Sequence, residues 1–567
     1  MPEPIRFVYR KETRADRRRT WRALSDTDAF NVAAKAGFEY PAERDAAGLA
    51  VKSGFVKKLG LTIRFREEAF SFRAPAWFRI RRVFESGPAA ELVATATLTE
   101  HPGGTVIDYA LEILPRSSIF RPILVLDLRR TTEKLVGAAL DAVVRSLDEL
   151  PDDDEPPPSL AGPAPRLQKA AAERLETLLG ELAPSPIRTR LGAFLRGAPE
   201  REQLMMSPIT LAESWAAPLD EVVACFVEAA RRGLLAVRLD LLCPACLVPR
   251  MPANLDATGP RVHCEGCGIL LDQSFPEALA VHFTPNPSVR PILAKIHCLG
   301  SPARTPHVVA QETLAPGAET NLATELQPGM YQLRTIPAFG PAALVEVSDS
   351  EIQKDAAFVL RGAIQPQLAP LRPLPRSVTL KNEQSAEVVA ILERIVPPRR
   401  VLSLGRVLVE FPDLRELVPN GGFFSRMTCF SGAALAVRAP SAEHASALAA
   451  ALPRARVTYA SEAIVLAIYA TTGSAIDDLA SVDRASSLWA LTDGAVFEHV
   501  LGKRIVPMGP AVDRAYALLA ASVPGKVAIP IAALESGEIE AVVRARALGA
   551  VPAIVSEPPE PAAWLVF

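Results

Sequence analysis

Hydrophobic and polar residues alternate along several short stretches of the first 150 residues, as they do in strands that bury one face. Strands are expected at residues 5–9, 61–65, 78–84, 91–98 and 105–113, and a short helix around residues 20–24. Apolar residues then recur at helical spacing over residues 122–150 (Val136, Ala139, Leu140, Val143, Val144, Leu147). The pattern predicts a sheet wrapped around a long final helix.

Residues 151–165 combine an acidic cluster with a proline run, which predicts a linker. The next segment, 166–242, is predicted to be helical, with helices at 167–182, 207–215 and 218–232 and a strand at 234–239. Helix, turn, helix and strand is a winged-helix-like order. The second helix of that pair begins with Asp220 and Glu221 and is basic only at Arg231 and Arg232, so nucleic-acid binding is not expected.

Four cysteines form two closely spaced pairs. Cys243 and Cys246 are followed, after seventeen residues, by Cys264 and Cys267. Two residues between cysteines let both thiolates reach one ion, and two such pairs complete a tetrahedron. The spacing predicts a zinc ribbon over 243–275. With four thiolates the zinc has no open position, so the site is expected to be structural.

Short strands with Pro-Gly turns are expected over 276–375, as a small β-rich domain, and 376–424 is expected to be a linker with helical character. Residues 425–567 predict an α/β domain, with a strand at 426–437, a helix at 441–452, a hairpin at 456–470 and a helix at 509–519. Overall the chain is predicted to be a multidomain α+β protein.

Composition adds that the chain is ordinary globular material. Of 567 residues, 49% are hydrophobic and 22% charged, and the net charge is −2, which argues against binding to nucleic acid by the chain as a whole. No apolar run is long enough for a membrane span, and the N-terminus does not resemble a secretory signal. The seven cysteines are too few for a disulfide framework. A cytoplasmic location is therefore expected.

The first domain resembles the helix-grip superfamily of START and polyketide-cyclase-like domains. The resemblance rests on the order of its elements together with Trp21, Ser25, Asp26, Thr27, Phe30, Asn31, Gly103, Gly104 and Thr105. Such domains usually enclose an apolar cavity between sheet and helix, so the resemblance implies an apolar small-molecule ligand. No catalytic motif comes with it.

Residues 207–334 resemble an uncharacterised region that precedes the catalytic domain in bacterial multidomain adenylate/guanylate cyclases. The stretches that carry the resemblance are GLL at 233–235, LCPAC at 242–246, HCEGC at 263–267, PSVR at 287–290, GSPARTPHVVAQ at 300–311 and PGMYQLR at 328–334. The resemblance implies that 425–567 is a class III cyclase domain with a ferredoxin-like core. Such a domain uses two metal-binding aspartates, and an asparagine and an arginine on one helix.

The functional positions of that family are largely replaced in this chain. The two metal aspartates fall on Gly432 and Glu462, and the asparagine and arginine fall on Asp513 and Ala517. The base-selecting lysine falls near Thr458. An alternative register places Asp413 at the first metal strand and moves Gly432 to the second metal position, and it too leaves a single metal carboxylate. A transition-state arginine is worth about 10³–10⁵ in rate in GTPases, so its loss predicts a catalytically silent domain.

These observations predict a bacterial-type signalling protein with a ligand-sensing N-terminal domain, a structural zinc site and no catalytic residues. The degenerate cyclase-like domain, whose residual site would hold Glu462 and Asp513, is expected to bind a protein partner or a second copy through 425–567. Two alternatives remain open. In the first, the chain is a nucleotide cyclase that is weakly active or is completed by a partner chain. In the second, it is a winged-helix and zinc-ribbon transcriptional regulator.

Overall fold

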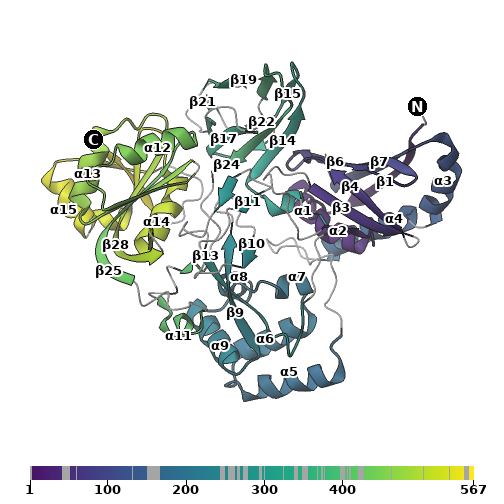
Figure 1. Cartoon of the computed structure of the whole chain (residues 1–567), viewed down its shortest axis with the longest axis horizontal. Helices are drawn as coiled ribbons and strands as arrows, with labels where there is room; N and C mark the ends of the chain where they lie inside the picture. Colours follow the sequence, from purple (N-terminus) through teal and green to yellow (C-terminus); the bar gives the residue numbers. More distant parts are fainter. Residues whose placement is uncertain are drawn as a thin grey trace.

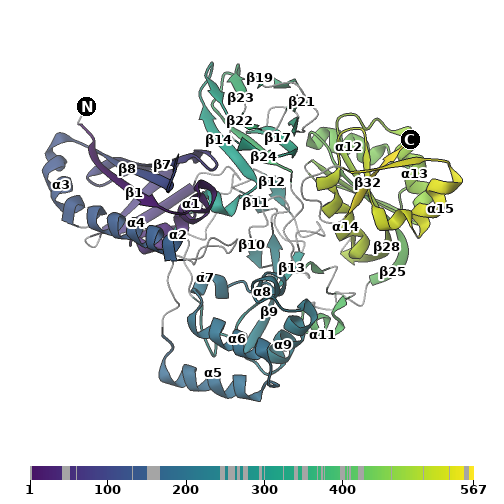
Figure 2. The ribbon, with the colours of Figure 1, turned by 180° about the vertical axis from the view of Figure 1, so that it is seen from behind.

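The computed structural model divides the chain into four parts (Figure 1). The N-terminal part and the C-terminal part lie on opposite sides of a β-rich part, with a helical part below it, and the view from behind shows the same arrangement (Figure 2). The structure describes residues 3–40, 52–58, 61–130, 132–149, 166–242, 249–252, 262–264, 269–271, 279–292, 297–298, 300–322, 325–337, 342–347, 355–366, 368–371, 374–375, 377–395, 402–404, 407, 410–418, 427–461, 463–501, 504–535, 537–553 and 561–567.

The N-terminal part is an antiparallel sheet in the order β2-β3-β4-β6-β7-β8-β1, with two helices across one face. All five predicted strands are present. Its elements are β1 (Ile5–Thr13), α1 (Arg17–Leu24), α2 (Thr27–Ala33), β2 (Phe38–Glu39), β3 (Lys52–Lys58), β4 (Leu61–Glu67), β5 (Ser71–Arg73), β6 (Trp77–Phe84), β7 (Ala89–His101), β8 (Gly104–Pro115), α3 (Arg121–Arg130) and α4 (Thr132–Glu149).

Helix α4 packs on the sheet through the apolar row that its sequence spacing predicts. Val136, Ala139, Leu140, Val143 and Leu147 are buried in one core with the inner residues of β6, β7 and β8. The long helix expected over 122–150 is present as α3 and α4, on either side of residue 131, which lies outside the described residues. The sheet and the two helices therefore enclose the core of this part.

Glycine at position 104 is required by the turn between β7 and β8. Its φ of +135° is one that residues with side chains rarely adopt, and a Cβ there would lie 2.0 Å from the carbonyl oxygen of Thr13. The neighbouring Thr105 hydroxyl donates to the carbonyl of Ala15 at 2.8 Å. The hairpin is thereby fixed against the chain that leaves β1.

The helical part combines five helices with a three-stranded sheet in the order β10-β9-β13. Helices α6 and α7, which the hydrophobic pattern did not reveal, join the three predicted ones. Its elements are α5 (Lys169–Glu181), α6 (Pro186–Gly197), α7 (Glu200–Gln203), α8 (Pro208–Ser214), α9 (Leu219–Arg231), β9 (Leu235–Leu242), β10 (Pro249–Pro252), β13 (Leu279–Pro285) and the hairpin β11 (Val262–Cys264) and β12 (Ile269–Leu271).

The described residues of the β-rich part form a small sheet of β16 and β22 and two larger sheets, in the orders β14-β24-β17-β18-β21 and β15-β23-β19-β20, with a shared core between the larger two. Its strands are β14 (Val308–Leu314), β15 (Glu319–Asn321), β16 (Glu325–Leu326), β17 (Gly329–Ile336), β18 (Ala343–Val347), β19 (Asp355–Arg361), β20 (Ala363–Gln365), β21 (Leu368–Leu371), β22 (Leu374–Pro375), β23 (Ser377–Asn382) and β24 (Val388–Arg394). The sequence pattern predicts that the β-rich domain ends at residue 375, whereas in the structure this part continues through β24. Strands β23 and β24 lie inside the two sheets because their alternating residues complete this core.

The C-terminal part is built on an eight-stranded sheet in the order β26-β27-β25-β28-β30-β32-β31, with β29 beside β28. Its first elements follow a strand, helix, strand, strand, helix, strand order, in which the second helix (Thr472–Ser481) and the fourth strand (Leu488–Leu501) were not predicted. Its elements are β25 (Met427–Arg438), α12 (Ala442–Ala450), β26 (Val457–Ser461), β27 (Ile464–Tyr469), α13 (Thr472–Ser481), β28 (Leu488–Leu501), β29 (Arg504–Met508), α14 (Pro510–Leu518), β30 (Val527–Pro530), α15 (Glu538–Ala545), β31 (Gly549–Pro552) and β32 (Ala562–Val566).

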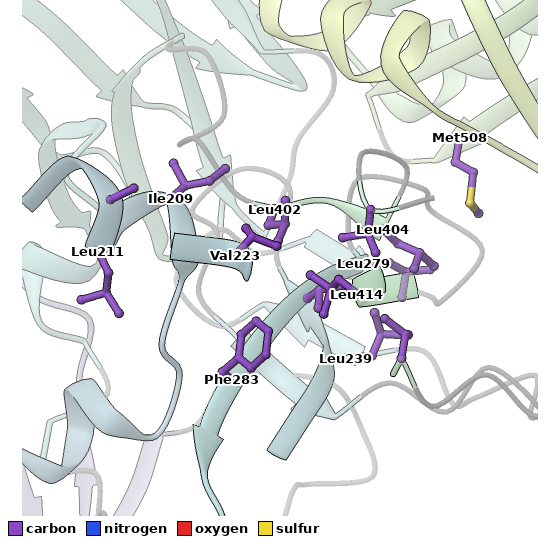
Figure 3. Packing of buried hydrophobic residues seen from close by; sticks show 14 of the residues in the cluster. Ile209, Leu211, Val223, Leu239, Leu279, Phe283, Leu402, Leu404, Leu414 and Met508 are labelled. Carbon is purple, nitrogen blue, oxygen red and sulfur yellow. The ribbon is translucent and has the colours of Figure 1, made fainter. Parts of the chain in front are cut away.

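Successive residues of β25 point to opposite faces of the sheet and are buried in two different cores. Ala433, Leu435 and Val437 pack under α12, α13 and α15, whereas Ala434 and Ala436 belong to the core that runs through α14 into the helical part. Figure 3 shows this second core, where Leu402 and Leu404 lie near Leu279 and Met508 is on the side of the C-terminal part. The C-terminal and helical parts therefore share one apolar interior.

The N-terminal sheet continues directly into the β-rich part, because β5 pairs with β14. The buried Arg73 guanidinium sits at this junction. It donates to the carbonyl of Asn321 and to the hydroxyl of Thr320, both at 2.9 Å, and pairs with Glu312 at 3.0 Å.

No helix in the described part of the chain is long and apolar enough to cross a membrane.

A buried carboxylate organises the side of the β-rich part that meets β25. Glu393 pairs with Arg334 at 2.9 Å, lies 3.7 Å from His307 and accepts a hydrogen bond from Gln332, which in turn accepts from Arg438 at 3.3 Å. Burial would raise the pKa of Glu393, but Arg334, His307 and Gln332 together lower it from 4.5 to about 2.

This lowered pKa makes the stability of the folded chain depend on pH. The ionised carboxylate contributes on the order of 3 kcal/mol at neutral pH, since each tenfold change in proton affinity is worth about 1.4 kcal/mol. The contribution is complete above pH 4.5 and is lost as the pH falls toward 2. Thermal unfolding of Glu393→Gln and the parent chain should differ most at pH 7, and the difference should narrow below pH 4.5.

The matched control is Glu383→Gln, which removes a carboxylate that pairs with Arg361 and Lys381 at the surface. A surface pair contributes little, so this variant should unfold almost as the parent does at every pH. A constant difference between Glu393→Gln and the parent from pH 7 to pH 3 would contradict the assignment.

Candidate functional site

A cavity of about 310 Å³ lies in the N-terminal part, between the sheet and helices α3 and α4. Its volume falls within the range of small-molecule sites. The lining is mostly apolar, and the strands and helices both contribute, including Phe84, Leu92, Leu111, Leu124, Leu128 and Val136. The pattern that predicted the sheet and the long helix therefore also predicted the walls of this cavity.

One charged side chain belongs to the wall. Strand β6 directs Phe78, Ile80, Arg82 and Phe84 to its buried face, so Arg82 lies in a row that is otherwise apolar. The partner of Arg82 is Glu67, directly across on β4, at 3.0 Å, and the Tyr40 hydroxyl donates to the same carboxylate. A buried ion pair of this kind is costly to desolvate and is not needed to hold a sheet together.

The environment of this pair keeps the arginine charged. Burial disfavours the charged form, but Tyr40 and Glu67 outweigh it, and the pKa of Arg82 lies above its ordinary value. Burial also raises the pKa of Tyr40, and that of Tyr109, another residue of the cavity wall. Both phenols are therefore protonated at neutral pH. The wall thus contains one neutral phenol, that of Tyr109, and one neutralised cation, that of Arg82, among mostly apolar residues.

A segment from far along the chain is held against this domain, and we call its described residues, 297, 298 and 300–303, the clasp segment. The Asp28 carboxylate accepts hydrogen bonds from the backbone N–H of His297 at 2.6 Å and of Cys298 at 2.8 Å. The Cys298 side chain is fully buried in the core of the N-terminal part, where its sulfur accepts from the hydroxyl of Thr27. The Ser301 hydroxyl donates to the carbonyl of Ser25.

The helical part supports the same corner. Arg201 of α7 pairs with Asp26 at 2.6 Å and lies 3.7 Å from Asp28. Asp26 is also the N-cap of α2, since it accepts from the backbone N–H of Ala29. Ser25, Asp26 and Thr27, three of the residues that carried the helix-grip resemblance, therefore contact other parts of the chain.

Two residues connect the clasp segment with the cavity. Asn31 lines the cavity and donates through its side chain to the carbonyl of His297 at 2.9 Å. Phe38 also lines it, and the carbonyl of Phe38 lies 2.8 Å from Nδ1 of His297. The wall of the cavity and the clasp segment are thus joined by direct hydrogen bonds.

Sequence reasoning did not single out Arg82, Asp28 or His297. The signal for Arg82 was present, because strict alternation along β6 places a charged residue among buried ones. No local pattern marks Asp28 or His297, since their partners lie about 270 residues away.

The positions that correspond to a cyclase site are only partly described. Glu462 lies outside the described residues. Asp513 lies in the first turn of α14, where its carboxylate accepts from the hydroxyl of Ser403, and Ala517 follows one turn later. Thr458 lies on β26. Asp413 lies on the short helix α11 (Pro412–Arg415) and pairs with Arg231, so the alternative register, which needs a strand there, is wrong.

The backbone at Gly432 leaves no room for a side chain. A Cβ on Gly432 would lie 2.5 Å from the carbonyl oxygen of Tyr469 and 2.7 Å from the ring of Phe430. The Arg456 guanidinium lies 4.7 Å from the centre of the Phe430 ring and pairs with Glu498 at 3.1 Å. An aspartate at position 432 is therefore excluded unless the strands separate.

The basic end of α9 is occupied by carboxylates. Arg231 pairs with Asp413 and with Glu416, and Arg232 pairs with Glu228 at 3.1 Å. Both arginines that a nucleic-acid reading of this helix would need are thus paired within the chain.

Both cysteine pairs lie at hairpin connections. Leu242 of β9 pairs with Pro249 of β10, and Cys243 and Cys246 fall between them in sequence. Cys264 of β11 pairs with Ile269 of β12, and Cys267 falls between those two. Cys243, Cys246 and Cys267 themselves lie outside the described residues. This backbone register fits two zinc knuckles, each carried by the turn of a hairpin.

Among the described residues, no group of three or more His, Cys, Asp and Glu side chains is arranged to hold a metal ion. Three of the four predicted ligands lie outside those residues, so the zinc site stays a prediction.

Comparisons with known proteins match separate segments of the chain. The family described as a family of unknown function (DUF5939) matches residues 169–301. No curated protein matches the chain.

Solved structures resemble about a quarter of the chain. Ara h 8.0201 has 10% identity and a TM-score of 0.19, and covers 25% of this chain and 99% of its own. The Zhui aromatase/cyclase from Streptomyces sp. R1128 has 11% identity and a TM-score of 0.21, and covers 26% and 97%. CV1439 from Chromobacterium violaceum has 15% identity and a TM-score of 0.18, and covers 26% and 100%. At such scores the likenesses carry no argument, and the interpretation of the N-terminal part depends on its own strands and helices.

We expect the purified chain to contain one tightly held zinc ion, because the two cysteine pairs supply four thiolates, which form a closed site. Elemental analysis should find about one zinc per chain in the parent and almost none in Cys267→Ser. Cys225→Ser is the control, since Cys225 is a free cysteine of α9 and should leave the zinc content unchanged. A zinc-free parent, or full zinc in Cys267→Ser, would show that the interpretation is wrong.

Proposed function

We propose that this protein is a ligand-responsive regulatory protein. Its N-terminal helix-grip domain takes up an apolar small molecule, and the clasp segment passes the bound state to the remainder of the chain. The observation that carries the proposal is that Asn31 and Phe38 both line the cavity and both contact His297. A ligand that moves this wall therefore changes the hydrogen bonds of a segment that belongs to the central region.

The size and lining of the cavity favour a domain that takes up a small molecule over a domain whose core is simply filled by side chains. A space of about 310 Å³ leaves many wall atoms without packing partners, which costs stability unless a ligand fills it. The buried Arg82–Glu67 pair in the wall adds a second cost that the fold itself does not require. A role in ligand binding would explain why the domain tolerates both the unfilled space and the buried ion pair.

The C-terminal domain is proposed to be a cyclase-like domain that acts by interaction. Its order β26-β27-β25-β28, with crossovers through α12 and α13, is the order of a ferredoxin-like unit, which a class III cyclase core contains. Support for a silent site comes from Gly432, where a metal-binding aspartate does not fit, and from Asp513, which is engaged by Ser403. We propose that the domain contacts a protein partner or a second copy of this chain.

Uptake of an uncharged apolar probe tests the first half of the proposal. N-phenyl-1-naphthylamine, which fluoresces strongly in apolar surroundings, should bind the parent chain with saturation. Ala94 lines the cavity from β7, so Ala94→Leu should weaken binding and Ala94→Phe should weaken it further, by tenfold or more, because each fills part of the space.

The control is Thr97→Phe, which places the same ring on the exposed face of β7 and should bind the probe as the parent does. Circular dichroism establishes that each variant is folded, and Ala94→Leu keeps the test informative if Ala94→Phe does not fold. Unchanged binding in a folded Ala94→Phe variant, or no saturable binding in the parent, would overturn the proposal.

The silent-site proposal predicts no cyclic nucleotide when the purified chain is incubated with ATP or GTP and Mn²⁺. Mass spectrometry of the products provides the measurement, and Glu462→Ala is the control. Cyclic nucleotide that the parent forms and Glu462→Ala does not would show instead that the chain is an active cyclase, which is the alternative function.

A further inference from the structure

The mouth of the cavity has a different chemical character from its interior. At one end of the cavity, β2 pairs with β3 through Phe38 and Val56, and both of these residues line it. Lys35 lies three residues before Phe38, Lys57 follows Val56, and both lysines line the cavity and are exposed. The ammonium group of Lys57 lies 5.6 Å from the centre of the Phe55 ring, so both lysine side chains border the same end of an apolar space.

No carboxylate offsets these lysines within the cavity. None of the described residues that line it is Asp or Glu, and neither lysine has an ion pair among the described residues. The third cation of the lining, Arg82, is already paired with Glu67. Among the described residues that line the cavity, the charge without a carboxylate partner is thus positive and lies at the mouth, where low-dielectric walls focus its potential toward an entering ligand.

The backbone at Lys35 gives an independent reason to assign it a role. Helix α2 ends at Ala33 with Ala34 as its C-cap, and Lys35 follows with a φ of +47°, in the left-handed region. Glycine or asparagine is usual at this position, and a residue with a longer side chain is strained there. Such strain is typically retained where the side chain is needed.

The interior of the cavity is apolar and suits the uncharged end of a ligand. Phe84, Leu92 and Leu111 of the sheet face Leu124 and Leu128 of α3 across the cavity. A molecule that fills this space and reaches the mouth must be apolar over most of its length and end beside the two lysines.

We propose that the ligand is an amphipathic carboxylate, whose apolar body fills the cavity and whose anionic head lies between Lys35 and Lys57. This rests on the proposed function, since it names the chemical class that the cavity takes. The two lysines determine specificity by attracting an anionic head and by disfavouring a cationic one of the same length.

Displacement of bound N-phenyl-1-naphthylamine by three matched ten-carbon amphiphiles tests the proposal. Decanoate, decanol and decylamine share an alkyl chain and differ in the head. In the parent chain at low ionic strength, decanoate should bind at least tenfold more tightly than decanol, and decylamine should bind least well. Added salt should reduce the preference, because part of it comes from exposed charges.

The variant Lys35→Gln/Lys57→Gln should bind the uncharged probe as the parent does and should lose the preference, so that decanoate and decanol differ by no more than about twofold. Lys134→Gln, which removes an exposed lysine of α4 that does not line the cavity, should keep the full preference.

Equal affinity of the parent for decanoate and decanol, with the probe still bound, would overturn the carboxylate proposal and leave the cavity proposal standing. A preference that survives in the double-lysine variant would overturn the assignment to Lys35 and Lys57. Failure of the probe itself to bind the parent would overturn both proposals.

Discussion

The carboxylate of Asp28 joins parts of the chain that lie about 270 residues apart, and the relation between the N-terminal domain and the rest of the molecule depends on it. This one carboxylate accepts hydrogen bonds from the backbone N–H groups of both His297 and Cys298. A buried N–H group without a partner is costly, so loss of this carboxylate would leave two such groups in the interior. The clasp segment is thereby bound to the domain that encloses the cavity.

The same corner relates the cavity to the other parts of the chain. The Cys298 side chain completes the core on which the cavity wall is built, Arg201 brings the helical part against Asp26, and β5 continues into β14. The C-terminal domain in turn shares its α14 core with the helical part, and Arg438 contacts the Glu393 cluster of the β-rich part. Packed interiors transmit a shift of one element to its neighbours, which is why a ligand in the first domain can affect the last.

Alternation and helical spacing were sufficient for the elements that bury one face against a partner close in sequence. The strands at 78–84 and 105–113 and the row of apolar residues on α4 were predicted for that reason. Strand β5 is only three residues long and depends on β14, so no local pattern marks it. Strands β23 and β24 were assigned to a connector because they pair with residues up to 85 positions earlier. The cavity was implied by the helix-grip resemblance and alternation along β6 marks Arg82, whereas the contact between Asp28 and His297 joins residues too far apart for any local pattern to show.

Hydrogen exchange at the backbone N–H groups of His297 and Cys298, followed by mass spectrometry of the peptide that contains them, tests the central claim most directly. With N-phenyl-1-naphthylamine at saturation, the account predicts that exchange of this peptide changes by severalfold, while that of a peptide from the distant strand β19 does not. Identical exchange of the clasp peptide in the free and the saturated protein would contradict the claim that the cavity and the clasp segment are coupled.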